Sequence, residues 1–250
     1  MIIDIETAAV IALAFFMGSL VKGVAGIGLP LVAIPILTFA MDVRDATPMI
    51  VGPAIITNVF QVIKTRQARL RYKEITPIIF GLLIGTFGGA LIAVSVNPNV
   101  MVGILGFVIL AFVAFSFSGY MPSIPQKGRL QMGFAAGTGT GLIGGMTGVF
   151  GPVLAIYTLA LKMPKDAFVW AMGVLLLLAS SGLGIFYATL GAFPIWVLIA
   201  SFGAMLPSYV GIVAGTRLRK IVSEKLFRNV VLSILGIIAL KHVASAFGLI

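Results

Sequence analysis

Two glycine-rich segments hold the residues whose spacing fits a binding site: GVAGIGLP at 23–30 and GMTGVFGP at 145–152. Their glycines and prolines correspond at a constant shift of 122 positions: Gly23, Gly26 and Pro30 match Gly145, Gly148 and Pro152. Glycine permits backbone angles that break a helix, and proline suits the first turn of the next helix. A helix that begins inside an apolar stretch presents free N–H groups and the positive end of its dipole, which bind anions. We therefore predict a pair of helix breaks that contribute to an anion site.

Close helix packing is the alternative explanation of these glycines. Small residues four positions apart let membrane helices approach each other, and the pairs Gly141 with Gly145 and Gly85 with Gly89 have this spacing. A single break would favour packing. Two corresponding breaks, each with a following proline, favour a substrate site.

Lys22 is the only charged residue well inside the first apolar stretch, and it directly precedes the first glycine segment. Burial of an ammonium group in hydrocarbon is costly, so Lys22 is expected to face a hydrated cavity or a charged partner. Its positive charge fits an anionic substrate. The alternative is that its side chain extends to the membrane surface from the end of a helix.

Amide side chains on the next apolar run supply further candidates. Asn58 and Gln61 are one helical turn apart, so both amides can face the interior of a bundle. At the 122-residue shift, Asn58 corresponds to Ser180. Such groups serve as hydrogen bonds between helices as readily as they bind a ligand. The predicted substrate-binding set is Lys22, Gly23, Gly26, Gly28, Asn58, Gln61, Gly145, Thr147, Gly148, Gly151 and Ser180, with Tyr187 and Tyr209 as secondary candidates.

Several kinds of chemistry lack the residues they need. The chain has no cysteine and a single histidine, His242, so we expect no thiolate chemistry, no metal site and no cofactor. Gly139, Gly141 and Gly144 spell a dinucleotide motif, but neither a strand nor the required acidic residue accompanies them. The short polar connector at 42–45 is interpreted as a solvated loop. We therefore do not expect an enzyme.

The composition indicates an integral membrane protein. Of the 250 residues, 60% are hydrophobic and 10% charged, and the mean hydropathy is +1.17. Apolar runs of helical length without strand-like alternation predict an all-α, polytopic fold. The net charge of +10 lies in the connectors between runs, which is typical of cytoplasmic loops and not of a nucleic-acid-binding face.

Six apolar runs are long enough to cross a membrane: 47–63, 75–95, 99–118, 167–190, 194–215 and 229–247. Two further stretches, 6–40 and 130–162, contain the glycine segments. In the first of these, the pieces 8–22 and 29–41 are each short for a full crossing. We predict two broken, re-entrant-like hairpins beside the six spans, or about ten helical pieces.

The charged connectors indicate that the two halves are inverted. A strongly basic connector at 64–74 follows the run 47–63 in the first half. In the second half, the corresponding region near Gly191 is neutral, and the basic connector at 217–228 follows the next run, 194–215. Basic connectors mark the cytoplasmic side. We therefore predict a first repeat at 1–122 and a second, inverted repeat at 123–250, with both termini outside.

At the glycine segments the chain resembles the TauE/SafE family of sulfite and organosulfur anion exporters, also called the toluene sulfonate uptake permease group. The resemblance rests on GSLVKGVAGIGLPLVAIPIL, GLIGGMTGVFGPVLAIYTL and the four-run pattern after each, and it covers essentially the whole chain. Lys22 and the sequence Gly28-Leu29-Pro30 depart from the commoner family pattern. The resemblance implies transport of small sulfur-containing or carboxylated anions such as sulfite, sulfoacetate or sulfonates.

We therefore expect a multi-pass secondary transporter of the bacterial inner membrane that exports such an anion by alternating access, since inverted repeats are typical of that mechanism. The alternatives are a channel or carrier for another small anion, such as a carboxylate, and an intramembrane enzyme. The expected partners are the anion and membrane lipid, with a homodimer as an option and no nucleic acid.

Overall fold

The computed structural model describes residues 4–25, 28–68, 75–120, 123–125 and 127–248, and its regular structure is helical throughout these ranges. A 3₁₀ turn covers Arg66–Ala68. The α-helices are α1 (Ile5–Ala25), α2 (Leu29–Leu37), α3 (Val43–Met49), α4 (Val51–Lys64), α5 (Thr76–Ser95), α6 (Pro98–Ser118), α7 (Arg129–Thr147), α8 (Gly151–Ala160), α9 (Lys165–Thr189), α10 (Ile195–Gly203), α11 (Met205–Leu218) and α12 (Glu224–Ala246).

Seven stretches of the described residues are long and apolar enough to cross a membrane: 5–25, 43–64, 76–95, 98–118, 166–189, 195–218 and 226–246. Two of them join a helix pair, α3 with α4 and α10 with α11. When each pair is counted once, the described helices number ten, as predicted. The all-α, polytopic fold is therefore confirmed.

The first helix corrects one prediction. The piece 8–22 was expected to be too short for a crossing, but α1 has 21 residues and is about 31 Å long at 1.5 Å per residue. It begins earlier than predicted and continues past Lys22, whose side chain is buried and donates a hydrogen bond to α4.

Both glycine segments break the chain between a long helix and a short one. Gly28, between α1 and α2, has a φ of 121°, and Gly148, between α7 and α8, has a φ of 73°; both values favour glycine. A proline lies in the first turn of α2 and of α8, as Pro30 and Pro152. These helices have 9 and 10 residues, which is about half the thickness of a bilayer.

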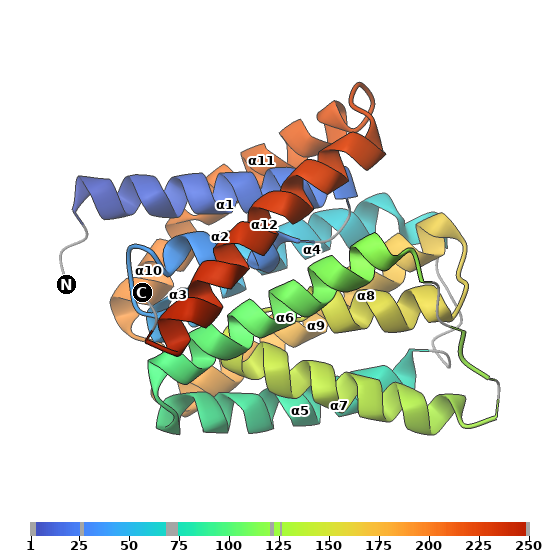
Figure 1. Cartoon of the computed structure of the whole chain (residues 1–250), viewed down its shortest axis with the longest axis horizontal. Helices are drawn as coiled ribbons and strands as arrows, with labels where there is room; N and C mark the ends of the chain where they lie inside the picture. Colours follow the sequence, from blue (N-terminus) through green and yellow to red (C-terminus); the bar gives the residue numbers. More distant parts are fainter. Residues whose placement is uncertain (1–3, 26–27, 69–74, 121–122, 126, 249–250) are drawn as a thin grey trace.

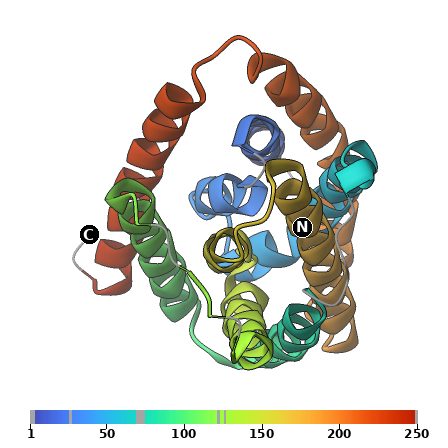
Figure 2. The same cartoon turned by 90° about the vertical axis from the view of Figure 1, so that its right-hand side faces the viewer.

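The longer helices pack in pairs across the two predicted halves. α1 lies along α11, and α5 lies along α7. The 122-residue shift converts α1 into α7 and α5 into the α10–α11 span, so each of these pairs is the counterpart of the other. α4 also packs on α9, and α6 on α12. Figure 2 shows α5 beside α7 and α6 beside α12. Contacts that come in counterpart pairs are expected of two related halves, and the division into 1–122 and 123–250 stays a prediction.

The two ends of the bundle differ in charge. The start of α1, the end of α12 and the α5–α6 and α9–α10 connections lie at the left in Figure 1, whereas the end of α4 and the start of α7 lie at the right. The right-hand ends are basic, with Lys64 in the last turn of α4, Arg129 at the start of α7 and Arg217 in the last turn of α11. We call this the basic end, and by the charge rule for membrane proteins we expect it to face the cytoplasm.

Candidate functional site

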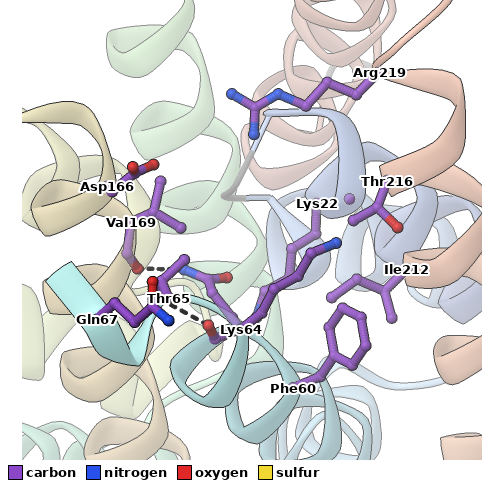
Figure 3. A pocket seen from close by; sticks show the side chains of 12 residues that line it. Lys22, Phe60, Lys64, Thr65, Gln67, Asp166, Val169, Ile212, Thr216 and Arg219 are labelled. Carbon is purple, nitrogen blue, oxygen red and sulfur yellow. Dashed lines mark hydrogen bonds between the residues drawn. The ribbon is translucent and has the colours of Figure 1, made fainter.

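A cavity of about 460 Å³ lies at the basic end of the bundle, where α1, α4, α9 and α11 meet (Figure 3). We call it the inner cavity. Three of its lining side chains are cationic and one is acidic. Its polar lining residues are Lys22, Gln61, Lys64, Thr65, Gln67, Asp166, Thr216 and Arg219, with Gly23, Phe60, Val169 and Ile212 as the remainder.

Lys22 is the deepest charge of this cavity. It lies in the last turn of α1 with an exposed fraction of 3%. Its Nζ donates one hydrogen bond to Oδ1 of Asn58 and another, at 3.2 Å, to Oγ1 of Thr57. Both acceptors are neutral. Within the described residues, the hydrogen bonds of this ammonium group therefore bring no negative charge to it. Because Lys22 is buried, its extension to the membrane surface is not observed.

Asn58 accepts a hydrogen bond from Lys22 but does not itself line the cavity. It lies on α4 with an exposed fraction of 1%, next to Thr57. Thr57 donates its own hydroxyl hydrogen to the carbonyl of Pro53, at 2.8 Å, so its oxygen is free to accept from Lys22. The local structure thus orients two acceptors toward the ammonium group.

Gln61 lines the cavity and also links two helices. Its Nε2 donates to the carbonyl oxygen of Val169 at 2.7 Å, which ties α4 to the first turns of α9. The hydrogen bond between helices, one of the two roles considered for this residue, is therefore present. Lys22, Gly23, Asn58 and Gln61 are the predicted site residues that the structure brings together.

The second glycine segment does not reach the inner cavity. The hydroxyl of Thr147 donates to the carbonyl of Ile143 at 2.8 Å and accepts from the amide of Val149 at 3.3 Å. Ser180 is also bonded within its own helix, to the carbonyl of Leu176 at 2.7 Å. None of Gly145, Thr147, Gly148, Gly151 and Ser180 lines the inner cavity.

Close packing accounts for two of the predicted glycines. A Cβ atom at Gly23 would lie 2.8 Å from Cα of Gly215 on α11. A Cβ atom at Gly145 would lie 2.9 Å from Cα of Gly89 on α5. Gly23 and Gly145 correspond at the 122-residue shift, so both halves use the same position for contact between helices.

The other glycines differ in their surroundings. Gly28 lines a separate cavity of about 240 Å³ together with Leu31 and Phe112. Gly148 lies against Ile34 and Thr47, and Gly151 has no atom of another residue within 4 Å of an added Cβ. Gly26 lies outside the described residues.

Nine of the twelve described residues that line the inner cavity were not predicted as site residues from the sequence, among them Lys64, Thr216 and Arg219. Lys64 and Arg219 were interpreted only as charges of cytoplasmic connectors, and Thr216 was not considered. Thr216 and Arg219 reach the cavity because α11 packs along α1, and Lys64 reaches it from α4, which packs on α11. No local pattern in the sequence shows these contacts. The 122-residue shift could have indicated the pairing of the helices, but not which side chains face inward.

Asp42 and His242 lie away from the inner cavity and make contacts within the fold. Asp42 caps α3 by accepting from the amide of Arg44 at 2.8 Å. His242 is buried, with Nε2 3.2 Å from Oγ1 of Thr38 and its ring centroid 5.6 Å from that of Phe39. His242 does not line the inner cavity.

Comparison with known proteins gives one match. Residues 10–242, which is most of the chain, match the family model described as sulfite exporter TauE/SafE. No curated protein and no solved structure matches the chain.

Proposed function

Because the chain belongs to the sulfite exporter TauE/SafE family, we propose that it is a secondary transporter that exports a small sulfur-containing anion. The family supports a membrane transporter of sulfur anions. The observation that carries the site assignment is Lys22, a buried ammonium group with two neutral hydrogen-bond acceptors at a cavity on the basic end. An anion in the cavity would supply the missing negative charge.

The physical argument concerns the cost of that charge. A buried ion without a counter-ion is unfavourable by several kcal/mol, and hydrogen bonds to neutral acceptors offset this only in part. A bound anion next to Lys22 offsets more of it, because charges attract strongly where water is excluded. The same cavity would bind a metal cation poorly, since among the described residues that line it three are cationic and one is acidic.

The rim of the cavity supports attraction of anions from the basic end. Lys64 and Arg219 reach it from the ends of α4 and α11, and Figure 3 shows them on different sides of the cavity from Asp166. Clefts lined by one sign of charge raise the local concentration of oppositely charged solutes. An anion would therefore meet the rim first and Lys22 next.

The proposed substrates are sulfite, sulfoacetate and related organosulfonates. A volume of about 460 Å³ exceeds that of sulfite alone and accommodates a short organosulfonate with its hydration water. The proposed location is the bacterial inner membrane, where an outside-positive potential favours anion export by about 2.3 kcal/mol per charge per 100 mV. Lipid is then the surrounding partner, and a homodimer is compatible with the proposal.

Alternating access is the proposed mechanism. Halves 1–122 and 123–250, as inverted repeats, would expose a shared site to each side in turn. The inner cavity, next to the basic connectors, corresponds to the inward-facing arrangement. This mechanism needs no catalytic group, in keeping with a family of transporters and not of enzymes.

The direct test is anion flux in proteoliposomes. Purified protein is reconstituted, radiolabelled sulfite or sulfoacetate is loaded, and an imposed potassium-diffusion potential drives the flux. We expect saturable flux that follows the sign of the potential and is inhibited by unlabelled sulfite. Saturable flux of acetate with none of any sulfur anion would instead show a carboxylate carrier, and flux that does not saturate would show a channel.

A further inference from the structure

A second, smaller cavity of about 200 Å³ lies at the end of the bundle opposite the basic end. We call it the outer cavity. Arg44, Ala93, Val94 and Tyr187 are among its lining residues. Tyr187 lies near the end of α9, whereas Asp166 of the inner cavity lies at the start of the same helix. At 1.5 Å per residue these positions are about 32 Å apart, which is the thickness of a membrane core.

The two cavities are lined by corresponding residues. The shift of 122 positions converts Arg44 into Asp166, Val94 into Thr216, and Thr65 into Tyr187. Asp166, Thr216 and Thr65 all line the inner cavity, while Arg44, Val94 and Tyr187 line the outer one. An accidental surface hollow would have no reason to use the counterparts of the residues around Lys22.

The outer cavity ends at the buried Tyr187, whereas the inner cavity reaches Gly23 and Lys22. The hydroxyl of Tyr187 donates to the carbonyl oxygen of Gly145 at 3.0 Å, and Tyr187 has an exposed fraction of 2%. Gly145 is the counterpart of Gly23, which lines the inner cavity beside Lys22. On the outer side, Tyr187 therefore fills the region next to Gly145. The corresponding region on the inner side, next to Gly23, is part of the inner cavity.

One buried polar group lies on the outer side without a partner. Thr47 on α3 is the counterpart of Val169, which lines the inner cavity. Thr47 is fully buried, and within the described residues its hydroxyl has no hydrogen-bond partner. An unsatisfied buried hydroxyl is unfavourable, and opening of the outer side would relieve it.

We propose that the outer cavity is the closed exit of the transport path, and that Tyr187 is the gate that closes it. This inference rests on the proposed alternating access. In the outward-facing arrangement Tyr187 leaves Gly145, the outer cavity deepens toward Thr47, and the anion departs past Arg44. The counterpart of Lys22 on this side is Gly144, so the exit has no equivalent deep cation and favours release.

Single cysteines report the accessibility of each cavity, because the chain has none of its own. Ala93→Cys places a thiol in the outer cavity at a site with an exposed fraction of 2%, and Thr216→Cys places one in the inner cavity. A membrane-impermeant thiol reagent is added to either side of oriented membrane vesicles, with and without sulfite. The rates of labelling are then measured for each variant.

Tyr187→Phe is the test of the gate. It removes one buried hydrogen bond, so we expect labelling of Ala93→Cys from the outside to become about fivefold faster and labelling of Thr216→Cys from the inside to become slower. The matched control is Tyr157→Phe, whose hydroxyl also donates to a carbonyl of α7, that of Arg129, at 3.0 Å, away from both cavities. It should change neither rate.

Separate outcomes distinguish the exit from the substrate. If sulfite flux is present but Tyr187→Phe leaves the labelling of Ala93→Cys unchanged, or if that thiol is labelled only from the inside, the exit assignment is overturned. If sulfur anions show no flux while the two labelling rates still change in opposite directions, the exit assignment stands and the proposed substrate is wrong.

Discussion

The Nζ of Lys22 donates a hydrogen bond to Oδ1 of Asn58, which joins the last turn of α1 to α4 deep in the bundle. Helices in a membrane are commonly joined by small residues and neutral hydrogen bonds, because a charge is costly there. This contact combines a charge with a neutral amide. It is therefore poorly explained as an element of stability alone and well explained as half of an anion site.

Lys22→Met tests the charge while its methylenes are largely kept. We expect sulfite flux at low concentration to fall about 10- to 100-fold, the range that corresponds to a lost interaction of ~1.5–3 kcal/mol with a charged group. The melting temperature should stay the same or rise, because replacement of a buried charge by an apolar side chain is often stabilising. Flux and thermal unfolding are measured on the same preparation.

The control for this variant is Lys127→Met, which removes a lysine that does not line the inner cavity. Its flux should equal that of the unmodified chain. Normal flux of Lys22→Met would assign Lys22 to helix packing and not to anion binding.

Asn58→Asp supplies the missing counter-charge from within the chain. The carboxylate would pair with Lys22, since opposite charges attract strongly in a site that excludes water. We expect the KM for sulfite to rise about tenfold or more, because the substrate must then displace or oppose a fixed negative charge. The concentration dependence of flux is the measurement. Asn97→Asp, at the exposed cap of α6, is the matched control and should be neutral. An unchanged KM in Asn58→Asp would mean that the anion does not contact Lys22.

The extent of α1 shows what the sequence could and could not predict. Lys22 was expected to face a hydrated cavity or a charged partner, because hydrocarbon does not solvate an ammonium group. It lines the inner cavity, and its two hydrogen-bond acceptors are neutral. The predicted piece 8–22 ends just before the first glycine segment, whereas α1 continues through Gly23 to Ala25. The tertiary contact of Lys22 with Asn58 fits a position inside the helix, and the sequence alone does not show that contact.

The sequence predicts that the glycine segments break the helices, but it does not predict what the individual glycines contact. Gly28 and Gly148 show the positive φ that the broken pattern requires. Whether Gly23 and Gly145 face a ligand or a helix depends on their neighbours, Gly215 and Gly89, which are distant in the sequence. The apolar runs predict the spans, but the pairing of α1 with α11 decides what the glycines contact.

The rim of the inner cavity offers a pair of opposite predictions. Arg219→Gln removes a cation and should raise the KM for sulfite about two- to fivefold, whereas Asp166→Asn removes the acid and should lower it by a similar factor. Both residues lie near water, so both effects should shrink as the ionic strength is raised. Flux is measured at low and high concentrations of a non-transported salt. Equal shifts in the same direction would indicate a change of structure and not of electrostatics.

Two glycine-to-alanine variants separate packing from anion binding in the second segment. Gly145→Ala places a methyl group 2.9 Å from Cα of Gly89, between two helix backbones that cannot easily move apart, so the free energy of unfolding should fall by about 1–3 kcal/mol. Gly151→Ala meets no atom of another residue within 4 Å and should leave both stability and flux unchanged. Thermal unfolding and sulfite flux are measured for both variants. If Gly151→Ala keeps its stability but loses flux, the first turn of α8 binds the anion directly, and the packing assignment for the second segment is incomplete.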